Sequence, residues 1–74
     1  MGILELKYNN KTLTTQSAIL KVLKEEKFYW LIDSELDSAI IEIKNHTLIW
    51  HEGIYKFGNW KYGIFKKGGF YGTW

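Results

Sequence analysis

The stretch that decides the fold is residues 50–74, WHEGIYKFGNWKYGIFKKGGFYGTW. An aromatic residue returns at every fifth position, and a glycine stands three places after each of the first four rings. The rings are Trp50, Tyr55, Trp60, Phe65 and Phe70, and the glycines are Gly53, Gly58, Gly63 and Gly68. Aligned in fives from Ile49, the consensus is Ile–aromatic–Lys–x–Gly. A repeat this regular indicates one short structural unit used several times.

An odd period has a consequence in β-structure. Successive side chains of a straight strand point to opposite faces, so rings five residues apart would alternate between faces. The chain must turn once per repeat to give every ring the same position, and glycine permits the positive φ that such a turn needs. Two geometries satisfy this requirement. One is a compact solenoid in which each unit forms one side, and the other is a meander of very short strands.

Residues 3–50 contain two segments typical of β-hairpins. In each, a polar pair (Asn-Asn, then Asn-His) separates alternating apolar residues, and Asn tolerates the positive φ of a two-residue type I′ turn. The registers that these turns set place Leu6 opposite Leu13 and Ile43 opposite Leu48. The apolar side chains of each hairpin then share one face of a sheet.

Residues 17–32 are ambiguous. As a hairpin, residues 18–33 turn through Lys24–Lys27 and pair Leu23 with Phe28. As a short helix, residues 17–27 are capped by Ser17, because the apolar pattern suits both periods. We favour the hairpin. The segment FYWLI (28–32) predicts a strand, since its residues are aromatic, β-branched or Leu.

The sequence therefore predicts an all-β single domain over residues 1–74. Antiparallel hairpins or a meander in residues 3–50 continue into the aromatic–glycine repeat of residues 49–74, and a short helix at residues 17–27 is the alternative.

Composition limits the class of protein further. The 74 residues include no cysteine, which excludes disulfides and thiolate metal sites. The first ten residues lack the basic start and apolar run of a signal peptide, and no apolar run approaches the ~20 residues of a membrane helix. We therefore expect a cytoplasmic protein. The net charge of +2 falls well short of a basic nucleic-acid footprint.

Two pieces of the repeat, GNWKYG (58–63) and FYGTW (70–74), resemble the G-x-W-x-x-G and Y-x-G-x-W pieces of MORN repeats. The tail also resembles short W-x-x-G-x-F-type repeats of uncharacterised phage and viral proteins. The MORN resemblance implies association with proteins or lipid head groups through a β-meander. The phage-like resemblance implies a small inhibitor of a host protein that acts in the host cytoplasm.

We expect a non-enzymatic protein-binding module, because exposed Trp and Tyr are the usual anchors of interfaces and a free sheet edge invites strand pairing. The predicted contact residues are the rings that remain exposed. The set comprises Tyr55, Phe57, Trp60, Tyr62, Phe70, Tyr71 and Trp74. Trp74 begins a fresh unit of the repeat, and we therefore expect the tail to form homo-oligomers.

Single-stranded nucleic acid is the alternative partner. Bases would stack on Tyr55, Trp60 or Phe65 while lysines contact phosphates. The lysines in question are Lys56, Lys61, Lys66 and Lys67. We favour the opposite arrangement, in which the rings form a core and the lysines its solvated outer face, because arginine is absent and the charge is small.

The sequence indicates neither a catalytic nor a metal site. His46, His51 and Glu52 have suitable ligand atoms, but their spacing differs from the helical H-E-x-x-H pattern. No Cys nucleophile, no Ser–His–acid set and no phosphate loop is present. We therefore expect no enzyme activity, no cofactor and no metal.

Overall fold

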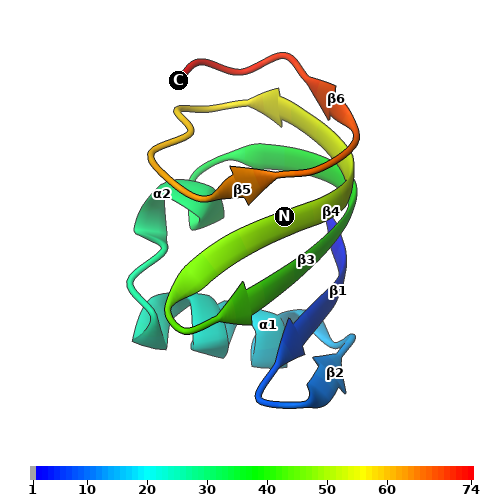
Figure 1. Cartoon of the computed structure of the whole chain (residues 1–74), viewed down its shortest axis with the longest axis vertical. Coiled ribbons are helices and arrows are strands. Elements are labelled where there is room, and N and C mark those ends of the chain that lie inside the picture. The colour runs from blue at the N-terminus through cyan, green and yellow to red at the C-terminus, as the bar shows by residue number, and fades with distance from the viewer. Residues whose placement is uncertain (1) are drawn as a thin grey trace.

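The computed structural model describes residues 2–74 as one sheet with two helices (Figure 1). The elements in chain order are β1 (Ile3–Tyr8), β2 (Lys11–Leu13), α1 (Gln16–Glu25), α2 (Tyr29–Ile32), β3 (Glu35–Lys44), β4 (Thr47–Phe57), β5 (Ile64–Phe65) and β6 (Gly69–Phe70). The strand order is β2-β1-β3-β4-β5, and β6 also pairs with β4. The prediction of an all-β fold is wrong. The fold is mixed α/β, because parallel strand pairs and helices stand where the sequence indicated only antiparallel hairpins.

Both predicted hairpins are present in the predicted registers. Leu6 lies opposite Leu13, and Ile43 lies opposite Leu48. The turn residues 9–10 and 45–46 all have φ between 49° and 62°. These are the positive values that a type I′ turn requires at both central positions.

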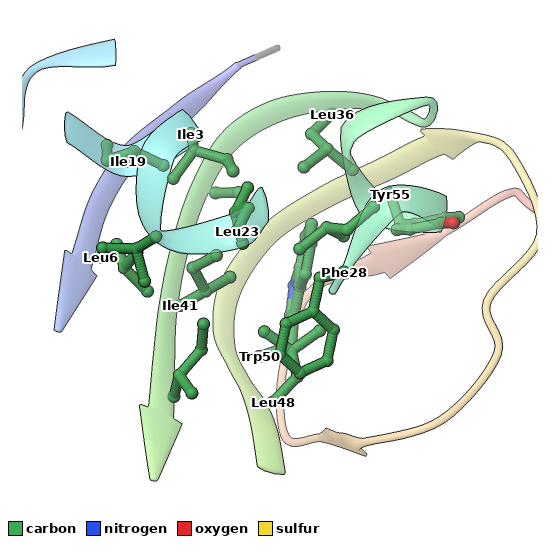
Figure 2. Close-up of a cluster of buried hydrophobic side chains, with 14 residues drawn as sticks. Ile3, Leu6, Ile19, Leu23, Phe28, Leu36, Ile41, Leu48, Trp50 and Tyr55 are labelled. Atoms are coloured by element: carbon green, nitrogen blue, oxygen red, sulfur yellow. The ribbon is translucent and has the colours of Figure 1, made fainter. Parts of the chain in front are cut away.

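The two hairpins are joined through a parallel pairing that the sequence did not reveal. β1 and β3 run parallel, with Leu6 beside Ile41, and the chain between them passes through β2 and both helices. A parallel pair needs such a long crossover, since a tight turn can only reverse the strand direction. The helices of the crossover cover one face of the sheet. Figure 2 shows Ile19 and Leu23 of α1 directed at the side chains of β1 and β3.

Helix α1 replaces the first half of the favoured hairpin. Ile19, Val22 and Leu23 are all buried, which is the i, i+3, i+4 spacing of a helix face. The helix begins after Thr15 instead of at Ser17 and ends at Glu25. The apolar pattern by itself fits both a helix and a strand. The burial of this one stripe against the sheet favours the helix.

The predicted strand at residues 28–32 is also wrong, because residues 29–32 form α2. The cause is the end of α1, where Lys27 has φ of 63° and its N–H donates to the Lys24 carbonyl. The Phe28 N–H donates to the Leu23 carbonyl at 2.8 Å. This pair of hydrogen bonds is a Schellman motif with Lys27 at the position that glycine usually takes. It redirects the chain so that Phe28 and Leu31 are buried, whereas a strand would bury every second residue.

Candidate functional site: an aromatic solenoid

Residues 49–74 form a solenoid, and we call this segment the aromatic solenoid. β5 and β6 both run parallel to β4, with Ile49 beside Ile64 and Ile54 beside Gly69. Each pair is 15 residues apart, so one turn of the solenoid contains three five-residue units. The meander is therefore wrong for the tail, and the compact alternative is the geometry that the chain adopts.

Stacked glycines make the corners between the units. Gly53, Gly58, Gly63 and Gly68 have φ between 117° and 132°, values that side-chain-bearing residues rarely adopt. Gly68 lies directly against the backbone carbonyl of Gly53, which is one full turn earlier. A Cβ atom at Gly68 would overlap that carbonyl. The fixed glycine spacing follows from this close approach of successive turns.

The five repeated rings fill the inside of the solenoid. Trp50 and Tyr55 are fully buried, and the other three rings are half-buried against the same core. Rings one turn apart stack: Trp50 lies 5.5 Å from Phe65, and Tyr55 lies 4.9 Å from Phe70. Trp60 meets these four rings edge-on at 5.6–6.1 Å. Both arrangements are favoured for aromatic pairs. The period of five thus places one ring of every unit in a common cluster.

A buried hydrogen-bond chain joins the solenoid to α2. Ser34 Oγ donates to the Trp30 carbonyl at 2.6 Å, so the Tyr55 hydroxyl donates to Ser34 Oγ, also at 2.6 Å. Burial raises the pKa of Tyr55, and the Ser34 hydrogen bond opposes that rise. Trp30 also packs edge-on against Trp60 at 5.2 Å. The solenoid is therefore anchored to the helical layer at its first turn.

The inward direction of the repeated rings bears on the alternative of a base-stacking surface. Tyr55, Trp60 and Phe65 all lie in the ring cluster, where Tyr55 is fully buried and Trp60 and Phe65 are half-buried. Lys56, Lys61, Lys66 and Lys67 are all exposed. The rings form the core and the lysines its outer surface, as the sequence analysis favoured.

The predicted protein-contact residues fall into two groups. Tyr55 is fully buried and Trp60 and Phe70 are half-buried, so the expectation that these rings are exposed is wrong. The remaining four are exposed by 50–83% of their surface. They are Phe57, Tyr62, Tyr71 and Trp74. Repeat position separates the groups: the inward rings occupy the second place of a unit, whereas Phe57 and Tyr62 occupy the fourth and Tyr71 the third.

The second turn of the solenoid leaves a free strand edge. Its backbone is bonded to the first turn, for example from the Lys66 N–H to the Trp50 carbonyl at 2.9 Å and from the Tyr71 N–H to the Tyr55 carbonyl at 2.8 Å. Within residues 2–74, β5 and β6 pair with no strand other than β4. Sequence reasoning missed this edge, because its location depends on the parallel return of the tail.

The two histidines lie apart, each beside a different glutamate. His46 Nδ1 donates to Glu26 Oε1 at 2.7 Å, and Glu26 Oε2 accepts from the Tyr8 hydroxyl at 2.8 Å. His51 Nε2 lies 2.9 Å from Glu42 Oε1. The hydrogen bond from the histidine is the main cause that lowers the pKa of each carboxyl.

Across residues 2–74, no group of three potential metal-ligating His, Asp or Glu side chains comes together. None of the helices in the described part of the chain is long and apolar enough to cross a bilayer.

Comparison with protein-family models, curated proteins and solved structures found no significant match to this chain. The resemblances to MORN repeats and to phage and viral repeats therefore stay hypotheses that rest on the quoted motifs alone.

Proposed function

We propose that this protein is a non-enzymatic protein-binding module that acts through the outer surface and free edge of the aromatic solenoid. The observation that carries this proposal is the distribution of exposed apolar side chains. Eight large ones are exposed in residues 2–74, and six of them lie between Ile54 and Trp74. Clustered exposure of this kind marks interaction surfaces.

The kind of side chain supports the same conclusion. Tyr71 is 76% exposed and Trp74 is 83% exposed, although both belong to the aromatic solenoid, whose five repeated rings are packed inside. Tyr and Trp are the residue types most enriched among interface hot spots, because each offers a large contact area with few rotatable bonds. The second turn of the solenoid therefore offers both anchoring rings and backbone groups.

Selection of binders against the full chain tests the proposal. A displayed library of random peptides is panned on the immobilised protein, and dissociation constants of the enriched peptides are then measured for Tyr71→Ala and Trp74→Ala. We expect losses of about tenfold or more for at least one of these variants, the size typical of a hot spot. The matched control is Tyr29→Ala, because Tyr29 is a 55% exposed ring on α2, outside the solenoid.

Two results would contradict the proposal. One is a failure of the selection to enrich any peptide. The other is a set of peptides that tolerate both solenoid variants but lose affinity with Tyr29→Ala. Each variant is checked by far-UV circular dichroism and thermal unfolding, so that a folding defect is not taken for lost binding.

The nucleic-acid alternative makes the opposite prediction. It requires salt-sensitive binding of a mixed-sequence single-stranded oligonucleotide that weakens when Lys56, Lys61 and Lys66 are changed to Gln. For the selected peptides, truncation of the exposed rings has the larger effect on affinity.

A further inference from the structure

The free edge of β5 has a defined set of backbone groups available for pairing. The Lys66 N–H points toward the first turn, where it donates to the Trp50 carbonyl. Adjacent residues of a strand direct their backbone groups to opposite edges, so the N–H and C=O of Phe65 face away from β4. Within residues 2–74 no further strand lies on that side. A segment that paired here would do so with Phe65.

Phe65 is half-buried and lies at the end of a ring stack in the described residues. Trp50 is the one ring in the described residues that stacks on it, with an interplanar angle of 13°, while Trp60 and Phe70 meet it edge-on. Phe70 differs, because both Tyr55 and Trp74 stack on it. An incoming aromatic side chain would continue this stack at Phe65.

The charges around this edge define the partner more closely. Lys66 and Lys67 are exposed next to Phe65, and residues 53–74 contain four lysines and no acidic residue. A second copy that paired through the same edge would bring like charges together, which is unfavourable. An acidic segment would neutralise them.

The molecule already contains a similar segment on the other side of β5. In β4, Ile49 pairs with Ile64 and Trp50 pairs with Phe65, in parallel register. Two residues further along, Glu52 and Lys67 line the same shallow groove. Residues 49–52 of the first turn have the order apolar–aromatic–x–acid. They lie beneath residues 64–67 of the second turn, which have the sequence Ile-Phe-Lys-Lys.

On the basis of the proposed function, we propose that the partner is an extended segment of another protein with the pattern apolar–aromatic–acid–acid–Gly. It adds to β5 as a parallel strand and continues the solenoid by one side. Its aromatic ring stacks on Phe65, and its acidic residues lie beside Lys66 and Lys67. Main-chain pairing supplies affinity and the side-chain pattern supplies specificity, as in other cases of strand addition.

A synthetic peptide, acetyl-SLIWEEGS-amide, tests this binding mode. It is titrated into the ¹⁵N-labelled full chain while amide chemical shifts are followed. We expect saturable shifts centred on Phe65, Lys66 and Lys67. N-methylation of the first Glu removes the N–H that would donate to the Phe65 carbonyl, and should weaken binding by about tenfold or more. N-methylation of the Trp, whose N–H faces the other edge, should change affinity less than twofold.

Charge exchange gives a second readout. Lys66→Glu with Lys67→Glu should weaken binding by about tenfold, and a peptide carrying Lys in place of both Glu residues should restore it. The matched control is Lys21→Glu with Lys24→Glu on α1, which should leave the affinity unchanged. Lys21 and Lys24 are exposed, like the edge lysines, but lie on a different element.

Several results would overturn the inference. They are no saturable shift up to the solubility limit, shifts centred on another surface, and equal effects of the two N-methyl groups. Displacement of the peptide by a single-stranded oligonucleotide, or a mass that grows with protein concentration through this edge, would also overturn it. If the library selection still yields peptides that depend on Tyr71 or Trp74, the proposed function stands while the strand-addition mode falls.

Discussion

Residues 16–32 and residues 49–74 both contribute apolar side chains to the core, but they are held in place differently. The helical segment buries one stripe of α1 and a few side chains of α2, and its backbone bonds are local. The solenoid buries one ring in every five residues and bonds its backbone to a turn 15 residues away. Side-chain volume should therefore govern the stability of the helical segment. The fit of the backbone at the glycine corners should govern the stability of the solenoid.

The sharpest test of this difference is a pair of adjacent glycines. Gly68 has φ of 130° and lies against the Gly53 carbonyl, whereas a Cβ atom at Gly69 would meet the Tyr71 ring at 3.1 Å. We expect Gly68→Ala to lower the free energy of unfolding by about 3 kcal/mol because strain and overlap add. Gly69→Ala should cost less than about 1 kcal/mol, since a flexible side chain can move. Guanidinium titrations measure both, and equal losses would contradict the corner geometry.

The buried link between the two regions should give the next largest effect. Ser34→Ala leaves the Tyr55 hydroxyl buried without its partner and should cost about 2 kcal/mol. Tyr55→Phe removes the hydroxyl itself and should cost about 1 kcal/mol. The double variant should lose less than the sum, because the two groups share one hydrogen bond. Strict additivity in urea unfolding would show that the two regions are not joined here.

Acidification tests a polar contact outside the solenoid. The hydrogen bond from His46 is the largest cause that lowers the pKa of Glu26 from 4.5. A lowered carboxyl pKa adds stability that is present above pH 4.5 and is lost as the pH falls through the folded value. His46→Ala should therefore reduce stability at pH 7 and flatten the loss between pH 5 and pH 3. Thr47→Ala, at an exposed neighbour, is the control and should retain the full pH dependence.

The smallest expected effect is a gain in the helical segment. Lys27 has φ of 63° at the end of α1, where glycine carries no steric penalty. Lys27→Gly should raise the free energy of unfolding by about 0.5–1 kcal/mol. Lys24→Gly, inside α1, should instead lower it by about 1 kcal/mol. A loss for Lys27→Gly in thermal unfolding would argue against the Schellman ending.

The two regions also differ in how far the sequence could predict them. The hairpin turns were predictable, because Asn-Asn and Asn-His act locally through their tolerance of positive φ. The five-residue period was also informative, because an odd period forces the chain to turn once in every unit. The helices were not predictable in this way. Phe28–Ile32 has strand-forming residues, and only the ending of α1 and burial on the sheet make it helical.

The candidate site was predictable only in part. Phe57, Tyr62, Tyr71 and Trp74 are exposed as expected, whereas Tyr55 is buried. The position within the repeat carried the signal that would have excluded Tyr55, since it shares the second place of the unit with Trp50. The free edge at Phe65 had no such signal. It depends on which segment the tail pairs with, and that choice is made by tertiary contacts.

The most direct test of the 15-residue solenoid is the measurement of couplings across backbone hydrogen bonds by NMR. The solenoid predicts a coupling between the Lys66 amide nitrogen and the Trp50 carbonyl carbon. It predicts a second coupling between the Tyr71 amide nitrogen and the Tyr55 carbonyl carbon. Both connect residues of successive turns. Couplings between neighbouring five-residue units, as in a meander, or rapid exchange of both amide protons would contradict the account.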